Sequence, residues 1–294
     1  MAGNAQTADG LKTLVIGYGS AGKRHVRILK ALGCEVSVSS VHARMSAVKM
    51  HYDYAVIASR TSDHGYWLSE VHASAVLVEK PVFGMPQEKI VLGLRRTMVG
   101  YNLRFHPVIR ELRRRIQNRK IYQAHFHVGQ WLPDWRPDRD YRKTDINGVL
   151  RDLSHELDLM TWLCGRPTIL GAVGGKLSDL DIGEDDCASF LAVCERVPQV
   201  LVSLNYLDKP PRRFIAMTTS DGTLLADLIG NTLKDGLETI SFNVGSDDTY
   251  RDMHIAMMTG KDADLLCSLD EGVELVNLAA LIESASGERR WLAA

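Results

Sequence analysis

The sequence of 294 residues predicts an α/β protein with two domains. Up to about residue 102, short β-rich runs alternate with helical stretches, which is typical of a parallel sheet flanked by helices. From about Tyr122, β-rich runs follow one another across turns such as 220–222 and 235–236, which indicates a large, mostly antiparallel sheet. No repeat or Pro/Ser-rich linker separates the two patterns, so domains over 1–102 and 103–294 are expected to join directly.

The first domain is expected to contain five short strands. Between Ser39 and Tyr54 there is too little chain for a full helix-strand-helix excursion, so this half of the sheet is expected to be trimmed. The expected strands are Thr13 to Gly17, Glu35 to Ser39, Tyr54 to Ser59, Ala75 to Glu79 and Arg96 to Tyr101.

The second domain is expected to combine an antiparallel sheet with two helices. One helix should run from His155 to Cys164 and end at Gly165, and a last one should lie near 269–284. Ser268 and Glu271 form a capping box at the start of that last helix. The expected strands are Ala124 to Gln130, Thr168 to Leu177, Ser189 to Val193, Gln199 to Tyr206, Phe214 to Thr219 and Thr223 to Leu228.

Composition excludes several classes of protein. The formal net charge of -1, with mixed signs, argues against a dedicated binder of nucleic acid or of an anionic membrane. The five cysteines are widely spaced without a metal-ligand pattern, so we expect free thiols and no metal site. The first ten residues lack a charged start followed by an apolar stretch, and no apolar run is long enough to span a bilayer. A soluble cytoplasmic protein is expected.

The most informative motif is Gly-x-Gly-x-x-Gly at Gly17, Gly19 and Gly22, between an apolar strand and a helix. The first glycine permits the tight turn, the second lets the backbone approach a pyrophosphate, and the third lets the helix pack on the strand. The N-terminus of the following helix presents amide groups and the positive end of its dipole to phosphates. The alternative is an ordinary tight turn, but the agreement of strand, turn and helix favours a dinucleotide cofactor.

Two further segments could carry the chemistry. Lys80 follows an apolar strand, where its ammonium could bind a substrate oxygen and stabilise alkoxide charge during hydride transfer, or could be an ordinary solvated lysine. Asp152 and His155 share a helix face if their segment is helical, and an imidazole oriented by a carboxylate suits removal of a hydroxyl proton. The alternative is a surface or capping histidine, and Glu156 and Asp158 are fallback candidates.

In order along the chain, these motifs resemble the Gfo/Idh/MocA family of NAD(P)-dependent oxidoreductases. The resemblance extends over nearly the whole chain. It rests on the glycine motif followed by Arg24-His25, Thr61-Ser62-Asp63-His64 after a strand, Glu79-Lys80-Pro81, 100–107 (Gly-Tyr-Asn-Leu-Arg-Phe-His-Pro) and the Asp152/His155 segment. The segments 131–137, 140–143 and 203–207 are similar to a branch associated with surface-sugar and acidic-sugar biosynthesis.

The resemblance implies a Rossmann NAD(P)-binding domain and a substrate-binding α/β domain, whose open antiparallel sheet forms a homodimer or homotetramer. It implies that Lys80 is the catalytic lysine and that Asp152 and His155 are the catalytic pair. Cofactor contacts are then expected from Gly17, Gly19, Ser20, Ala21, Gly22, Ser39, Ser40, Arg44, Ser59, Thr61, His64, Glu79 and Asn102. Substrate contacts are expected from Lys80, Arg104, Trp131, Arg136, Tyr141 and Arg142.

The loop after Trp131 is open to two interpretations. Arg136, Arg142 and their basic neighbours could recognise a phosphate or carboxylate. Alternatively, Asp134, Asp138 and Asp140 could neutralise them within the loop.

The chain departs from the family pattern in three ways. The glycine run before the catalytic segment is reduced to Gly148, Asp152 and His155 are one residue closer than usual, and the first domain is short. An acid usually binds the adenosine ribose about 20 residues beyond the glycine turn, but Ser39 and Ser40 stand there, followed by Arg44. NADP is therefore favoured weakly over NAD.

These observations predict hydride transfer between NAD(P) and a CH–OH or C=O carbon of a sugar, cyclitol or nucleotide-linked sugar. The substrate is expected to be a small polar molecule, with an anionic group favoured by the basic loop. A catalytically idle ligand-binding or regulatory protein and a reductase of a non-sugar specialised metabolite are the alternatives.

Overall fold

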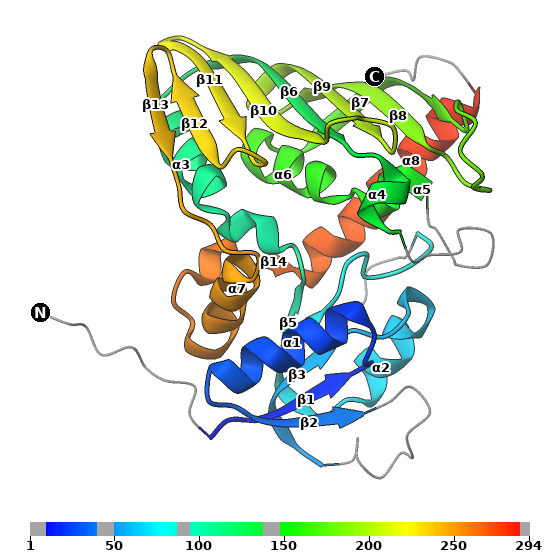
Figure 1. Cartoon of the computed structure of the whole chain (residues 1–294), viewed down its shortest axis with the longest axis vertical. Coiled ribbons are helices and arrows are strands. Elements are labelled where there is room, and N and C mark those ends of the chain that lie inside the picture. Colours follow the sequence, from blue (N-terminus) through cyan, green and yellow to red (C-terminus); the bar gives the residue numbers. More distant parts are fainter. Residues whose placement is uncertain (1–9, 40–49, 87–94, 138–147, 289–294) are drawn as a thin grey trace, which may run out of the picture. The chain divides into compact units, whose positions relative to one another are not determined.

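The computed structural model describes residues 10–39, 50–86, 95–137 and 148–288 and divides the chain into two compact units (Figure 1). The first unit is Met1–Phe105 with Gly245–Val276, and the second is His106–Val244 with Asn277–Ala294. The return of residues 245–276 to the first unit is not part of the predicted division at residue 102.

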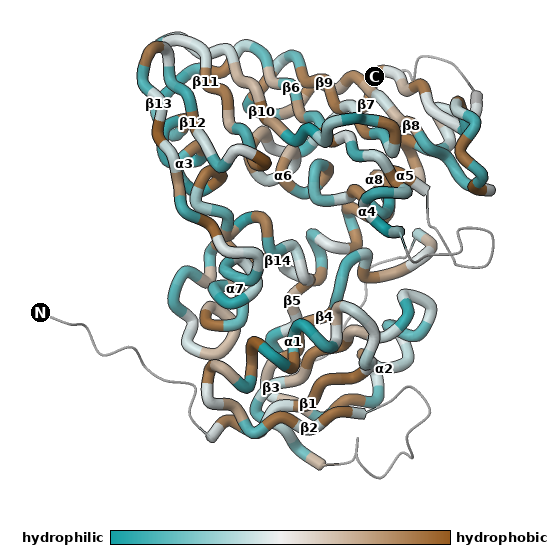
Figure 2. Tube along the Cα trace, viewed as in Figure 1, coloured by the Kyte–Doolittle hydropathy of each residue, from teal (hydrophilic) through white to brown (hydrophobic). Residues whose placement is uncertain are grey.

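The first unit is built on a six-stranded sheet in the order β14-β5-β4-β3-β1-β2. All pairs are parallel except β14 with β5. The inner strands β1 and β3 are hydrophobic along most of their length, as expected for strands buried in a parallel sheet (Figure 2). The strands are β1 Lys12–Ile16, β2 Glu35–Ser39, β3 Tyr52–Ile57, β4 Ala73–Val78, β5 Arg96–Val99 and β14 Cys267–Ser268.

Helices from both segments of the first unit accompany this sheet. Helix α7 was not predicted, and it contacts α1 and β4. The predicted capping box at the start of α8 is confirmed, because the Ser268 amide donates to Glu271 Oε2 at 2.7 Å and the Glu271 amide donates to Ser268 Oγ at 3.2 Å. The helices are α1 Ser20–Ala31, α2 His64–Glu70, α7 Asp248–Thr259 and α8 Leu269–Glu288, with short 3-10 turns η1 Thr61–Asp63, η2 Asn102–Phe105 and η3 Ala263–Leu265. Helix α8 continues into the second unit from Asn277 onward.

The second unit contains an eight-stranded sheet in the order β13-β12-β11-β10-β6-β9-β8-β7. As predicted, it is mostly antiparallel, with β6 and β9 forming its parallel pair. The strands are β6 Ile121–Gly129, β7 Pro167–Gly175, β8 Cys187–Cys194, β9 Val197–Asn205, β10 Arg212–Thr219, β11 Gly222–Asp227, β12 Thr232–Asp235 and β13 Glu238–Ser241.

Buried residues alternate with more exposed ones along β8, β9 and β10, so one face of the sheet packs against the core. The predicted helix His155–Cys164 is confirmed as α6, and Gly165 ends it with a positive φ of 88°. The other helices are α3 Pro107–Ile116, α4 Leu132–Trp135 and α5 Gly148–Asp152.

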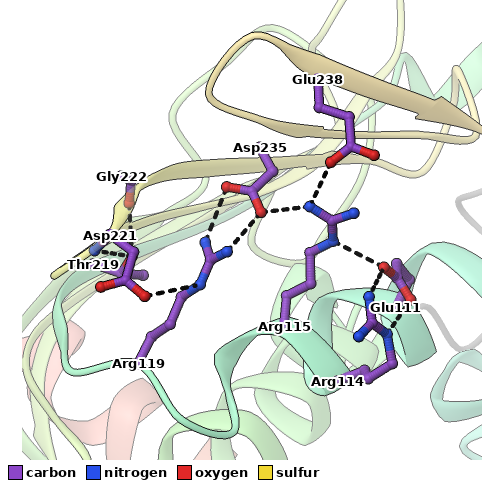
Figure 3. A network of polar contacts seen from close by, with 9 residues as sticks. All are labelled: Glu111, Arg114, Arg115, Arg119, Thr219, Asp221, Gly222, Asp235 and Glu238. Atoms are coloured by element: carbon purple, nitrogen blue, oxygen red, sulfur yellow. Dashed lines mark hydrogen bonds and ion pairs between the residues drawn. The ribbon is translucent and has the colours of Figure 1, made fainter.

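An ion-pair network joins α3 to the β12-β13 hairpin (Figure 3). Arg119 binds both carboxylate oxygens of Asp235 at 2.9 and 2.8 Å, and Arg115 contacts Asp235, Glu238 and Glu111. These contacts fix the outermost hairpin of the sheet to a helix of the same unit.

The five cysteines are free thiols, as predicted. Within the described ranges, no helix is long and apolar enough to cross a membrane.

Candidate functional site

The segments after four parallel strands of the first unit lie at one edge of its sheet. Backbone bonds continue the ladder there, with Ala58 N donating to Ile16 O, Glu79 N to Ile57 O and Gly100 N to Val78 O, each at 2.8 Å. The chain passes from β2 to β3 across β1, so a topological switch point lies between β1 and β3. Ligands of open parallel sheets bind at such a point, beyond the carboxyl ends of the strands.

The three glycines of the motif lie at this switch point and differ in their surroundings. Gly17 has φ of +96°, and a Cβ on it would collide with the Ala58 carbonyl. A Cβ on Gly22 would collide with the Gly17 carbonyl. Gly19, in contrast, has no atom of the described residues within 4 Å of its Cβ position, apart from its own chain neighbours. The fold itself therefore requires two of the glycines, whereas the third leaves room for a ligand to approach the backbone.

Helix α1 starts directly after this open glycine. No side chain caps its N-terminus within the described residues, and its first turn holds no acidic residue. The amide groups of the first turn, including those of Ser20 and Ala21, have no intrahelical acceptor and can bind phosphate oxygens. The turn and the helix start thus fit the pyrophosphate of a dinucleotide.

The end of β2 is the expected site of cofactor choice. Ser39 is 1% exposed, and its carbonyl accepts the Gly17 amide at 2.9 Å. Ser40 and Arg44 lie outside the described residues.

The other predicted cofactor residues of the first unit lie in different environments. Ser59 donates to the Arg60 carbonyl at 3.3 Å, and Thr61 begins η1. His64 is buried with Nδ1 3.1 Å from the Val82 carbonyl, and burial lowers its pKa. Its Nε2 is buried and has no hydrogen-bond partner among the described residues. Asn102 is buried and donates to Thr249 Oγ1 at 2.6 Å.

Lys80 lies two residues beyond the end of β4, as predicted. Its backbone amide donates to Glu79 Oε2 at 3.2 Å, while Glu79 Oε1 lies 2.8 Å from His25 Nε2. Burial by itself raises the pKa of Glu79, but the His25 hydrogen bond and the charges of His25 and Lys80 lower it below its usual value. Lys80 is therefore placed beside a fixed carboxylate.

Asp152 and His155 belong to the second unit and do not share one helix. Asp152 ends α5 and His155 begins α6, with a two-residue turn between them. The positions of these two side chains are therefore not set by a common helix face.

The Asp152 carboxylate is held by two partners. Tyr206 donates to Asp152 Oδ2 at 3.0 Å, and Arg136 Nη1 lies 3.0 Å from the same oxygen. The Arg136 guanidinium also lies over the Trp135 ring, 3.9 Å from its centroid. The structure thus brings Arg136, a predicted substrate residue, to Asp152, a predicted catalytic residue. Arg136 is paired with a carboxylate, as in the second interpretation of the loop, but that carboxylate lies outside the loop.

The fallback acid Glu156 has a different partner. It is 2% exposed, and Arg213 on β10 binds both of its oxygens at 2.7 and 3.0 Å. This bidentate pair joins α6 to the sheet. Asp158 is fully buried.

The remaining predicted substrate residues that the structure describes each have partners within their own unit. Trp131 lies under Lys209, whose Nζ is 3.5 Å from the ring centroid. Arg104 is 2% exposed in the first unit and binds Glu271 at 3.1 Å and the Leu266 carbonyl at 3.3 Å. Tyr141 and Arg142 lie outside the described residues.

Sequence reasoning assigned no role to Tyr206, Arg213 or His254. Tyr206 could have been found, because a tyrosine directly after an alternating strand places a hydroxyl at the sheet edge. The contacts of Arg213 and His254 join segments far apart in the sequence, which no local pattern reveals.

Comparison with known proteins agrees with this geometry. Residues 109–224 match the model of the GFO/IDH/MocA C-terminal domain. A search of curated protein sequences found no match.

Several solved structures share the fold over almost the full length of both chains. UDP-N-acetylglucosamine 3-dehydrogenase GnnA from Acidithiobacillus ferrooxidans is 19% identical, with a TM-score of 0.76 and coverage of 96% of this chain and 99% of that chain. WlbA dehydrogenase from Bordetella pertussis, in complex with NADH and UDP-GlcNAcA, is 16% identical, with a TM-score of 0.72 and coverage of 98% and 99%. GenD2 from gentamicin A biosynthesis, in complex with NAD, is 16% identical, with a TM-score of 0.76 and coverage of 98% of each chain. The domain match over residues 109–224 agrees with the Gfo/Idh/MocA resemblance that the motifs indicate, and the solved structures share the fold of the chain.

Proposed function

We propose that this protein is an NAD(P)-dependent oxidoreductase of a sugar, a cyclitol or a nucleotide-linked sugar. It transfers a hydride between the cofactor and a carbon that alternates between CH–OH and C=O. The observation that carries the proposal is the glycine turn at the β1/β3 switch point, where Gly19 is open although Gly17 and Gly22 are packed against backbone.

Different residues have different roles in the oxidation of an alcohol. A bound nicotinamide supplies the acceptor for the hydride. Lys80 binds the reacting oxygen and stabilises its negative charge as the C–H bond breaks. His155 takes the hydroxyl proton as the C=O bond forms, and Asp152, held by Tyr206 and Arg136, orients the imidazole. In the reverse direction His155 returns this proton.

A polar substrate with an anionic group fits the second unit. Arg136 is fixed by Trp135 and Asp152, so its guanidinium is preorganised for a carboxylate or phosphate. The similar WlbA dehydrogenase is in complex with UDP-GlcNAcA, and the similar GnnA is a UDP-N-acetylglucosamine 3-dehydrogenase, which agrees with this class.

Three finer proposals accompany the main one. NADP is favoured weakly, because no carboxylate stands at Ser39 or Ser40. The less buried sheet face of the second unit includes apolar residues such as Val173 and Val193, at 64% and 40% exposure, which supports a homodimer or homotetramer through this sheet. The five free thiols support a reducing, cytoplasmic location.

The role of Lys80 is tested with Lys80→Met. Turnover on a panel of sugars and UDP-sugars, read at the nicotinamide absorbance band with NAD and with NADP, is expected to fall by about a hundredfold or more. The cofactor dissociation constant is expected to change less than about threefold. Lys234→Met, which removes an exposed lysine of β12, is the matched control and retains activity.

Retained turnover in Lys80→Met contradicts the assigned role. If the unmodified protein binds a panel compound in calorimetry but turns over none, the idle ligand-binding alternative replaces the enzyme. A higher catalytic efficiency with NAD than with NADP contradicts the cofactor preference.

A further inference from the structure

Four side chains, three of them buried, form a continuous hydrogen-bonded chain that ends beside Lys80, and we call it the Glu79 relay. Glu79 Oε1 lies 2.8 Å from His25 Nε2, His25 Nδ1 lies 2.9 Å from His254 Nε2, and His254 Nδ1 lies 2.8 Å from the Tyr54 hydroxyl. The residues come from the end of β4, from α1, from α7 and from β3, all within the first unit.

The inner members of the relay are shielded from water, whereas the Glu79 side chain is 13% exposed. His25 and His254 are fully buried and Tyr54 is 1% exposed. Burial raises the pKa of Tyr54 well above its usual value. Burial, together with the charge of His25, lowers the pKa of His254 well below its usual value. The far end of the relay therefore holds a protonated phenol and a neutral imidazole, and each must find its partner inside the protein.

These constraints give the uncharged relay a single direction. An ionised Glu79 only accepts, so His25 Nε2 carries a proton and His25 Nδ1 is an acceptor. His254 then donates from Nε2 to His25, and Tyr54 donates to His254 Nδ1. Every donor and acceptor along the four side chains is satisfied in this arrangement.

Uptake of one proton reverses the inner bonds. His25 then donates from both nitrogens, His254 moves its proton from Nε2 to Nδ1, and Tyr54 accepts instead of donating. The Tyr54 hydroxyl hydrogen loses its acceptor in the buried core, which is costly. The charged arrangement is therefore disfavoured as long as another positively charged partner balances Glu79.

Lys80 is such a partner. Its amide donates to Glu79, and its charge lowers the pKa of that carboxyl. We propose that the Glu79 relay is the positioning device for Lys80, because it fixes an ionised carboxylate beside the lysine and stays uncharged so that the lysine ammonium balances it. When Lys80 loses its charge, His25 takes up a proton in its place. This inference rests on the proposed role of Lys80 and extends it to His25, His254 and Tyr54, to which no substrate or cofactor contact is assigned.

The other ionisable groups near the relay are the same in all the variants compared below, except that Tyr250 is replaced in Tyr250→Phe. Those that act on relay members are Cys34 and Arg96 near Tyr54, His64 near Glu79, and Tyr250 with its neighbours Arg24 and Asp247.

The test uses the cofactor-free full chain and needs no turnover. Imidazole nitrogens are followed by NMR with 15N-labelled histidine, and Lys80 is followed with 13Cε-labelled lysine, assigned by comparison with Lys80→Met. In the unmodified protein at pH 7.5, His25 and His254 are each expected to be protonated at Nε2 alone. Tyr54→Phe and Lys80→Met are each expected to raise the midpoint of His25 protonation by about one pH unit, a tenfold change.

The coupling is reciprocal, so removing the carboxylate must act on the lysine. Glu79→Gln is expected to lower the pH at which Lys80 loses its proton by about one unit. Tyr250→Phe is the matched control: its ring contacts His25 edge-on at 5.7 Å, but its hydroxyl is not part of the relay. It is expected to leave both midpoints unchanged.

A doubly protonated His25 in the unmodified protein at pH 7.5 overturns the proposal. The proposal is also overturned if the midpoint of His25 protonation in Tyr54→Phe and in Lys80→Met equals the midpoint in Tyr250→Phe. A purely structural role changes the melting temperature without moving the Lys80 titration, and this result also refutes the proposal. Failure of the hydride-transfer function appears instead as missing turnover, with the NMR result unaffected.

Discussion

At the scale of single residues, identical side chains serve different purposes. Gly17 and Gly22 are required by the backbone around them, whereas Gly19 has open space. Arg136 and Arg213 both bind carboxylates, but the first holds Asp152 and the second holds the buried Glu156. Residue type and spacing predict functional roles for several of these positions, and the neighbouring atoms show which of them the fold requires.

The glycine turn allows ligand binding and stability to be separated. Gly19→Ala is expected to change the free energy of unfolding by less than about 0.5 kcal/mol, because the added Cβ meets no atom of the part of the chain that the structure describes. The cofactor dissociation constant is expected to rise about tenfold or more, because the methyl group occupies the approach of the pyrophosphate. Gly17→Ala is expected to cost more than about 2 kcal/mol, since φ is +96° and the Ala58 carbonyl blocks the Cβ.

Urea unfolding of the cofactor-free variants and fluorescence titration with NADH and NADPH measure the two quantities. Unchanged cofactor affinity in Gly19→Ala contradicts the assignment of this turn to the pyrophosphate.

At the scale of secondary-structure elements, ion pairs fasten helices to the second sheet. The Glu156–Arg213 pair joins α6 to β10 from within the core, and the network of Figure 3 joins α3 to the β12-β13 hairpin near the surface. Burial determines how much each pair contributes, because a buried charge that loses its partner is costly while an exposed one is solvated.

Glu156→Gln is therefore expected to act on stability and not on turnover. Loss of the charge opposite Arg213 is expected to lower the free energy of unfolding by roughly 3 kcal/mol. Glu283→Gln is the matched control: Glu283 makes the same bidentate contact with Arg151 at 31% exposure, and the expected loss is below about 1 kcal/mol. Lost turnover at unchanged stability would instead make Glu156 the catalytic base.

The surface network predicts a pH dependence. Hydrogen bonds from Arg119 and Arg115 lower the pKa of Asp235 to about 2, and those from Arg114 and Arg115 lower the pKa of Glu111 to about 2. A carboxyl whose pKa is lower in the folded state stabilises the fold above its unfolded pKa of about 4, and this stabilisation is lost as pH falls from 4 to 2.

Asp235→Asn is expected to lose roughly 1–2 kcal/mol of stability above pH 5, and the difference should shrink toward zero near pH 2. Urea unfolding at a series of pH values measures this difference. Asp221→Asn, at a carboxylate 58% exposed and 3.6 Å from Arg119, should show almost no such dependence. A constant difference down to pH 2 contradicts the contribution of the network.

At the scale of the whole molecule, the sequence predicted both sheets, the helix from His155 to Cys164 and the capping box at Ser268. These features depend on local patterns of hydrophobicity and turn residues. The unpredicted features depend on contacts between distant segments: His25 with His254, Glu156 with Arg213, and the return of residues 245–276 to the first unit. A periodic pattern describes one element at a time, so it cannot show which distant element will satisfy a buried polar group.

The return of residues 245–276 also imposes an order on synthesis. A nascent chain that has reached Phe105 lacks α7, β14 and with them His254, so the first unit cannot be completed. The entire second-unit sheet emerges from the ribosome before the missing segment does, a delay on the order of ten seconds or more at ordinary elongation rates. During this interval β5 is an unpaired sheet edge and His25 lacks its partner. The first unit is therefore completed after the sheet of the second unit has been synthesised, although its own first segment is synthesised earlier.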